Sequence, residues 1–268
     1  MSTERIALIA GAGEFPRLFV REARKRGVEP VVVALKEEAD PAIEADVDEV
    51  HWMPLGKVGK LLRLLAREKV TRAVVAGKVH KTRIFKDFRP DVKALTLLWG
   101  LRDRKDDTIM EKVAEVLAAE GIELIPQTTF MEEYLPGPGV FTRREPTAEE
   151  REDVRFGAEI ARAMGGLDIG QTVVVKRGAV LAVEAIEGTD QAIRRGGSLG
   201  NGDVVVVKVA KPDQDLRFDV PAVGLETVYA CLDARARVLA IEGGKTFFFQ
   251  RDEAVALADR HQLTIVAF

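Results

Sequence analysis

Five charged residues alternate with other residues in one short segment of the chain. They are Lys211, Asp213, Asp215, Arg217 and Asp219. Because side chains along an extended chain point alternately to opposite faces, we expect all five charges on one face of an extended ribbon. Three carboxylates between two cations form a set that can bind a divalent metal ion and a phosphate group. A solvated, charged strand edge is the alternative interpretation.

A second charged group lies upstream, in the segment LAVEAIEGTD, residues 181–190. We expect a strand that breaks at Gly188 and a helix that begins with Thr189 or Asp190 as its N-cap. The break brings Glu184, Glu187 and Asp190 close to the end of that strand. A surface ion pair for Glu184 and a capping role for Asp190 are the structural alternatives.

Two arginines follow about one helical turn after the predicted cap. Arg194 and Arg195 can each bind a phosphate group through two parallel hydrogen bonds. Two groups of acidic and basic residues in one region favour a site for a hard cation and a phosphate.

The chain begins with a glycine motif, IALIAGAGEFP, in which a buried strand leads through Gly11 and Gly13 into a helix. Such glycines allow the backbone to approach a phosphate at a helix N-terminus. As a dinucleotide fingerprint the motif is incomplete, because Pro16 occupies the third glycine position and the second strand ends at Leu35 without an acidic residue. The sequence therefore disfavours NAD, and a tight turn without a ligand explains the glycines equally well.

Elements alternate regularly through the first half of the chain. Strands are expected at 5–10, 30–35, 47–53, 72–77 and 122–125, and helices at 16–26, 58–69, 91–99 and 108–120, the last opened by a capping box of Thr108 and Glu111. This alternation predicts a Rossmann-like, doubly wound parallel sheet in an α/β N-domain. Ligands of such sheets bind at the carboxyl ends of the strands, where the chain supplies Gly13, Glu14, Lys78 and Thr128. The basic loop with Lys78, His80, Lys81 and Arg83 suits an anionic ligand or is simply solvated.

The second half has a different character. Residues 135–146 begin with Leu-Pro-Gly-Pro-Gly and predict a linker between an N-domain, 1–134, and a C-domain, 147–268. Thr147 and Glu150 form a capping box that opens a helix to about Met164. Strands at 172–176, 179–184, 204–209, 238–242, 246–249 and 263–268, with helices at 190–195, 225–234 and 252–261, predict a mixed α+β domain.

The composition of the chain excludes several classes of function. The net charge of −3 gives no basic field that would recruit nucleic acid. Cys231 is the only cysteine, which excludes an internal disulfide, indicates a reducing cytoplasm and, in its apolar helical setting, predicts a buried thiol. No apolar run is long enough to span a membrane or to act as a signal peptide. His80 has no second histidine or cysteine at zinc-ligand spacing, so the sequence disfavours a zinc site. The chain has no Gly-x-Ser-x-Gly elbow, so it gives little support to a hydrolase with a serine nucleophile.

Seven segments, in this order and spacing, resemble the UDP-2,3-diacylglucosamine pyrophosphatases of lipid A synthesis, of the type unrelated to calcineurin-like phosphoesterases. They are IALIAGAGEFP, AGKV, DDTIM, LDIGQTVVV, AVEAIEGTDQAIRR, AKPDQDLRFDVPAVGLETV and EGGKTFFFQRDE. The resemblance spans essentially the whole chain. It implies a cytoplasmic, Mg²⁺-dependent enzyme of two domains that hydrolyses UDP-2,3-diacylglucosamine to UMP and 2,3-diacylglucosamine 1-phosphate.

The resemblance also assigns site residues. Asp219 falls on the essential aspartate of the family, which implies that it binds Mg²⁺ or orients the attacking water. Glu187 and Asp190 would complete the metal site, and the substrate would be bound by Gly13, Glu14, Lys78, Thr128, Thr189, Arg194 and Lys211. Two departures from the family pattern, the bulky Phe247–Phe249 and a short connection at 196–198, are expected to alter the acyl chamber and its cover.

The sequence leaves two other function classes open. One is a nucleotide-binding regulatory module without catalysis, and the other is a nucleotide-sugar transferase with a different acceptor. Because the implied substrate and product are amphiphiles, we expect transient contact with the inner face of the cytoplasmic membrane. The acyl-chain length, the oligomeric state, including domain exchange between chains, and the exact metal ligands are not determined by the sequence.

Overall fold

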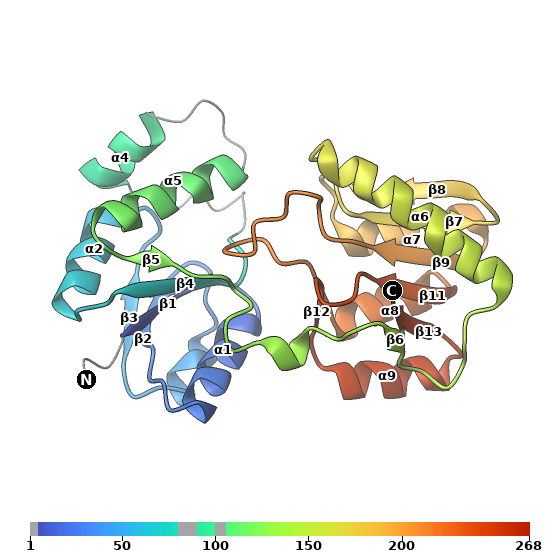
Figure 1. Cartoon of the computed structure of the whole chain (residues 1–268), viewed down its shortest axis with the longest axis horizontal. Helices are drawn as coiled ribbons and strands as arrows, with labels where there is room; N and C mark the ends of the chain where they lie inside the picture. Colours follow the sequence, from blue (N-terminus) through green and yellow to red (C-terminus); the bar gives the residue numbers. More distant parts are fainter. Residues whose placement is uncertain (1–4, 80–89, 100–105) are drawn as a thin grey trace. The chain divides into compact units, whose positions relative to one another are not determined.

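The computed structural model describes residues 5–79, 90–99 and 106–268, with only the backbone of 97–99 and 106–107. His80, Lys81 and Arg83 of the predicted basic loop lie outside the described residues. The chain divides into two compact units (Figure 1). The first comprises Met1–Met131 together with Leu216–Phe218, and the second comprises Glu132–Asp215 and Asp219–Phe268.

The first unit is a parallel sheet with helices on both faces. Its strands are β1 (Ile6–Ala10), β2 (Val31–Leu35), β3 (Val50–Met53), β4 (Arg72–Ala76) and β5 (Glu123–Leu124). Its helices are α1 (Phe15–Lys25), the short 3₁₀ helix η1 (Pro41–Ala45), α2 (Val58–Arg67), α4 (Val92–Trp99) and α5 (Asp106–Ala119).

The strand order β3-β2-β1-β4-β5, with every pairing parallel, confirms the predicted doubly wound sheet. All five residues of β1 are buried, as a central strand covered on both faces requires. The order reverses between β1 and β4, so the carboxyl ends of these two strands form the topological switch point.

Helices cover the two faces of this sheet separately. Leu65 of α2 and Leu117 of α5 join a buried cluster with Ala7 and Val33 of the strands. Figure 1 shows α1 on the opposite side of the sheet from α5. Helix α5 begins at Asp106, two residues before Thr108, so the predicted capping box at Thr108 is wrong.

The second unit is built on a longer, mixed sheet. Its strands are β6 (Gly139–Val140), β7 (Thr172–Lys176), β8 (Ala179–Val183), β9 (Val204–Lys208), β10 (Ala222–Val223), β11 (Ala236–Ile241), β12 (Phe247–Phe248) and β13 (Thr264–Ala267). Its helices are η2 (Glu132–Tyr134), α6 (Ala148–Gly166), α7 (Thr189–Gly200), α8 (Leu225–Asp233) and α9 (Arg251–Arg260).

Six of these strands form one sheet in the order β6-β13-β11-β9-β7-β8, and β10 pairs with β12. β9, β11 and β13 are parallel, whereas β6 and β7 run antiparallel to their neighbours, which confirms the predicted mixed domain. The central strand β9 is buried on both faces: Val205 and Val207 pack toward α6, and Val204 and Val206 pack toward α7 and α8. The sheet thus lies between two helical layers.

Helix α7 is longer than the sequence predicts and continues through residues 196–198. The expected short connection at that point is therefore wrong. A Cβ at Gly196 would lie 2.5 Å from Val174 Cβ, and one at Gly197 would lie 2.4 Å from Ala234 Cα. The two glycines are needed because α7 packs closely against β7 and α8, and this requirement outweighs their low helix propensity.

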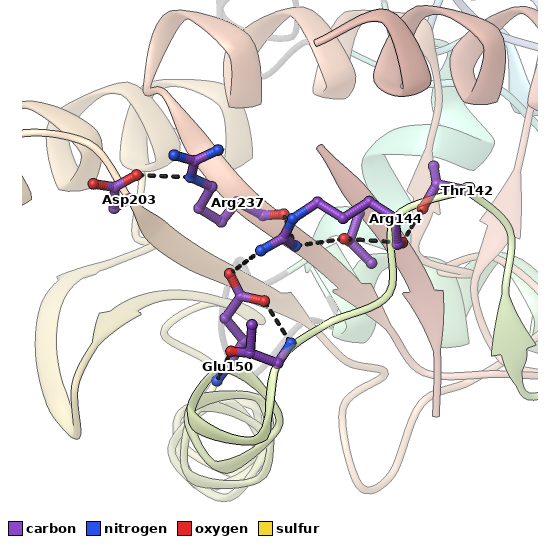
Figure 2. A network of polar contacts seen from close by, with 7 residues as sticks. Thr142, Arg144, Glu150, Asp203 and Arg237 are labelled. Atoms are coloured by element: carbon purple, nitrogen blue, oxygen red, sulfur yellow. Dashed lines mark hydrogen bonds and ion pairs between the residues drawn. The ribbon is translucent and has the colours of Figure 1, made fainter. Parts of the chain in front are cut away.

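An ion-paired network fixes the segment that leads into α6 (Figure 2). Thr147 and Glu150 form the predicted capping box, which is confirmed. The other Glu150 oxygen accepts from Arg144 Nη2 at 2.6 Å, and Arg144 Nη1 donates to Thr264 Oγ1 of β13 at 2.7 Å. In the part of the chain that the structure describes, no helix is both long and apolar enough to cross a membrane.

Candidate active site

The segment between β9 and β10 is folded into turns, so the predicted extended ribbon is wrong. Gln214 N–H donates to the Lys211 carbonyl at 3.1 Å, and Asp219 N–H donates to the Asp215 carbonyl at 3.1 Å. Pro212 explains the first turn, because it fixes its own φ, has no N–H for a ladder and favours the second position of a β-turn. The five charges therefore do not share one face.

The turns bring the ends of this segment together around Asp219. Gln214 Nε2 donates to Asp219 Oδ2 at 2.5 Å, and Lys211 Nζ lies 3.5 Å from the same oxygen. Lys211 Nζ also bonds Asp168 Oδ1 at 2.8 Å. The Asp219 side chain is 36% exposed and that of Lys211 20%, so a solvated ligand can reach both. We refer to Asp168, Lys211, Gln214 and Asp219 as the Asp219 cluster.

The short strand β12 supports this segment from its far end. Phe247 N–H donates to the Pro221 carbonyl at 2.8 Å, and Phe249 N–H donates to the Val223 carbonyl at 2.9 Å. The Phe247 and Phe248 side chains are each only 1% exposed, and the Phe247 ring stacks on Phe249 with centroids 5.2 Å apart. The bulky residues that we expected to alter an acyl chamber are therefore part of the core that holds residues 221–223.

A buried polar group lies at the carboxyl end of β9, within the same unit. Lys208, only 6% exposed, donates from Nζ to Thr189 Oγ1 at 2.8 Å. The Thr189 hydroxyl in turn donates to Glu184 Oε1 at 2.8 Å. We call these three residues the Lys208 cluster. It joins the ends of β8 and β9 to the first turn of α7, whose N-cap Gly188 has a φ of +84° and no side-chain capping bond.

The two clusters are joined through the turn that precedes β7. Asp168 of this turn contacts Lys211, and a Cβ at Gly170 would lie 2.2 Å from the Glu184 carbonyl oxygen. Only glycine permits this close approach. The motif LDIGQTVVV thus holds the Asp219 cluster and the Lys208 cluster at the same edge of the sheet.

Three other predicted site residues have defined positions. Glu187 pairs with Arg195 at 2.5 Å; its own backbone N–H and the Arg195 guanidinium lower the pKa of its carboxyl group. Arg194 pairs with Asp233 of α8 at 2.9 Å. Asp190 lies half-buried in the first turn of α7. Among the described residues no group of three or more His, Cys, Asp or Glu side chains could hold a metal ion, so Glu187, Asp190 and Asp219 do not form a preassembled centre.

The predicted residues of the first unit lie beyond the carboxyl ends of its strands, those after β1 and β4 at the switch point. The loops after β1 and β4 are joined by hydrogen bonds from Ala12 N–H to the Lys78 carbonyl (2.8 Å) and from Lys78 N–H to the Ala12 carbonyl (2.9 Å). Gly13 and Glu14 open α1 beside this bridge and are exposed, as is Lys78. Thr128 follows β5 and is half-buried at the same edge of the sheet.

Two glycines at this switch point have a purely structural explanation. A Cβ at Gly11 would lie 2.6 Å from the Lys78 carbonyl oxygen, and one at Gly77 would lie 2.6 Å from the Ala12 carbonyl oxygen. These glycines allow two backbone segments to approach each other. Gly13 has a φ of +95° and open space around it, so its role is conformational.

Three residues of the site were missed by the sequence analysis. Lys208 carried a signal, because it is the only charge in the apolar run VVVVKVA and ends a buried strand. Gln214 and Asp168 lie within two of the motif segments quoted above, but the sequence did not show their contacts, because these depend on turns that bring distant parts of the chain together. Cys231 is fully buried, as predicted, and burial raises the pKa of its thiol.

Comparison with known proteins covers both units. The family model described as the LpxI N-terminal domain matches residues 5–134, and that of the LpxI C-terminal domain matches residues 137–266. The UDP-2,3-diacylglucosamine pyrophosphatase LpxI of Caulobacter vibrioides is 31% identical over 270 residues, which cover 95% of this chain and 94% of that protein.

Two solved structures are much more distantly similar. The biotin carboxylase domain of a single-chain bacterial carboxylase is 18% identical, with a TM-score of 0.28, over 61% of this chain and 35% of that chain. The biotin carboxylase domain of Hydrogenobacter thermophilus 2-oxoglutarate carboxylase is 12% identical, with a TM-score of 0.28, over 74% of this chain and 41% of that chain. These values support no conclusion about fold or function. The two family models, by contrast, match nearly the whole sequence: the chain belongs to the LpxI family.

Proposed function

We propose that this protein hydrolyses UDP-2,3-diacylglucosamine to UMP and 2,3-diacylglucosamine 1-phosphate in lipid A biosynthesis. The observation that carries the proposal is the 31% identity to a UDP-2,3-diacylglucosamine pyrophosphatase over 95% of this chain. The Asp219 cluster supports it, because a partly exposed carboxylate beside a lysine and an amide is suited to diphosphate chemistry.

The reaction needs a positioned water and neutralised phosphate oxygens. In the proposed step the water oxygen bonds to the phosphorus on the sugar side, the bond from that phosphorus to the bridging oxygen breaks, and UMP leaves. Asp219 orients the water and takes up its proton, which is later lost to solvent. Lys211 stabilises the negative charge that develops on the phosphoryl oxygens.

The proposal includes Mg²⁺, which the Asp219 carboxylate is suited to hold. Proteins commonly bind Mg²⁺ through one or two carboxylates together with substrate phosphates, so no preassembled cluster is required. Among the described residues, Asp219 Oδ1 accepts no hydrogen bond. When bound, the metal ion would neutralise charge on the diphosphate. Asp190 and Glu187 remain predicted ligands, and Glu187 would have to leave Arg195.

Substrate binding is proposed for residues of both units. In the second unit these are Thr189, Arg194 and Lys211, and in the first unit Gly13, Glu14, Lys78 and Thr128. The carboxyl ends of parallel strands, where the first-unit residues lie, are the usual ligand sites of doubly wound sheets. We further propose a cytoplasmic location with transient contact at the inner face of the membrane, which cosedimentation with liposomes would test; protein that stays in the supernatant with every lipid contradicts the contact.

The decisive experiment is an assay with UDP-2,3-diacylglucosamine and Mg²⁺ in ¹⁸O-water. We expect metal-dependent UMP release with the label in the sugar phosphate. Asp219→Ala should abolish release while remaining folded. Asp213→Ala is the matched control, because Asp213 is an exposed acid of the same segment and has no polar contact among the described residues.

Other outcomes would change the assignment. Label in UMP would still establish the hydrolysis but would show that water attacks the phosphorus on the uridine side. Release only with a second substrate would indicate a transferase. No release by folded wild-type protein, with nucleotide binding intact, would favour a regulatory module.

A further inference from the structure

Both ends of the Gln214 side chain are used within the Asp219 cluster. Its Oε1 accepts a hydrogen bond from the Lys211 backbone N–H at 2.8 Å, and its Nε2 donates to Asp219 Oδ2 at 2.5 Å. The amide orientation is determined by these partners, because a backbone N–H only donates and an ionised carboxylate only accepts. Gln214 therefore connects the start of the turn directly to the Asp219 carboxylate.

Gln214 is a closer partner of Asp219 than the neighbouring cation. Lys211 Nζ is 3.5 Å from Asp219 Oδ2 but 2.8 Å from Asp168 Oδ1, so its charge is shared with Asp168. A flexible, shared ammonium group does not by itself fix the direction of a carboxylate. The planar amide, held at its other end by the backbone, supplies that direction.

The two carboxylate oxygens of Asp219 have different contacts. Gln214 donates to Oδ2, and the Lys211 contact at 3.5 Å is to the same oxygen, whereas Oδ1 accepts no hydrogen bond from the described residues. The Asp219 backbone is also restrained, because its N–H donates to the Asp215 carbonyl at 3.1 Å. Oδ2 is thus held by a hydrogen bond, and Oδ1 is left without one in a side chain that is 36% exposed.

We propose that Gln214 is a positioning residue, which holds Asp219 Oδ2 so that Oδ1 points at the reacting water or at the metal ion. This inference rests on the proposed function and assigns a role that acts entirely through Asp219. Gln214 itself need not touch the substrate. A carboxylate that rotates freely would lose the alignment on which the attack depends.

Three substitutions at Gln214 distinguish the contributions of its two hydrogen bonds. Gln214→Glu keeps an acceptor for the Lys211 N–H but replaces the donor with a second carboxylate facing Asp219. Gln214→Ala removes both bonds. Gln214→Asn keeps the amide but is one methylene too short to reach both partners. Gln262→Glu is the matched control, because Gln262 is exposed in the turn before β13, at the opposite end of the parallel strands.

The kinetic pattern is specific to positioning. For Gln214→Ala we expect kcat to fall about 10- to 100-fold while KM changes less than about threefold. The kcat of Gln214→Asn should be intermediate between that of Gln214→Ala and that of the wild type. For Gln214→Glu a second carboxylate would face Asp219 in place of the amide donor and repel it, so we expect kcat to fall at least as far as in Gln214→Ala.

Several results would overturn the proposal. A wild-type kcat in folded Gln214→Ala and Gln214→Glu would show that Asp219 needs no amide partner. A rise in KM alone would make Gln214 a substrate-binding residue. If Gln214→Ala is unstable, Gln214→Glu decides, because it preserves the turn. Failure of the proposed function is distinguishable, since it would show as absent hydrolysis in the wild type itself.

Discussion

Lys208 Nζ donates a 2.8 Å hydrogen bond to Thr189 Oγ1, and this contact links the end of β9 to the first turn of α7. The bond fixes the direction of the next one, because a threonine hydroxyl that accepts from lysine has its proton available for Glu184. A buried ammonium and a carboxylate are thus connected through one hydroxyl. These two hydrogen bonds hold the ends of β8 and β9 against the first turn of α7.

Replacing Lys208 should therefore affect stability first. In Lys208→Met, Thr189 loses its donor and the Glu184 carboxylate loses the nearby charge, so we expect unfolding free energy to fall by about 1–3 kcal/mol. Urea unfolding measures this change. Lys36→Met, at an exposed lysine of the first unit, is the control and should change little. An unchanged midpoint in Lys208→Met would show that the contact is not stabilising.

The ionised Glu150 carboxylate should make the free energy of unfolding depend on pH. Burial alone would raise the pKa of its carboxyl group, but hydrogen bonds from Arg144 and Thr147 outweigh this effect and keep the pKa below the ordinary 4.5. Because the folded pKa is lowered, the stabilisation is complete above pH 4.5 and is lost as the pH falls through the folded pKa. We expect Glu150→Gln to cost about 1–3 kcal/mol at neutral pH, with the difference from wild type shrinking in acid.

Urea unfolding at several pH values, for wild type and Glu150→Gln, tests this linkage. Glu145→Gln is the control, since the Glu145 side chain is 74% exposed and pairs only at the surface with Arg151. A stability difference that is independent of pH would contradict the assignment.

The loops at the switch point of the first unit should not tolerate a side chain. Gly77 has a φ of +89° and would place a Cβ 2.6 Å from the Ala12 carbonyl oxygen, so Gly77→Ala should lower stability by about 1–3 kcal/mol. Thermal unfolding detects the loss. Gly137→Ala, with nothing within 4 Å of the added Cβ, should be close to neutral. Equal effects of the two substitutions would rule out the close approach as the cause.

Cys231 should be chemically inert in the folded protein. It is fully buried in α8, and burial raises the pKa of its thiol, so little thiolate is available to react. We expect a thiol reagent to modify it only as fast as the protein unfolds, with full reaction in urea. Rapid modification of the native protein would show that α8 opens locally.

The sequence predicted the positions of most elements because their signals are local. Val204–Val207 is a continuous apolar run, which indicates a strand covered on both faces, and Thr147 with Glu150 marks a helix start within four residues. The capping box at Thr108 failed because the sequence could not show that the acidic residues before it were already helical. The glycines at 196 and 197 misled the prediction for a related reason, since their role lies in contacts with Val174 and Ala234.

By itself, the sequence determined the class of each sheet, the family and the residue types available for diphosphate chemistry, because periodicity and motif spacing are properties of the chain. Only the tertiary structure decided which of these residues meet. Asp219 is joined to Gln214 and Lys211 because the chain turns back at Pro212 after β9, and Lys208 meets Thr189 because two strand ends and a helix converge. Such pairings depend on turn geometry and strand register, which bring together side chains from separate elements and are not encoded in any local pattern.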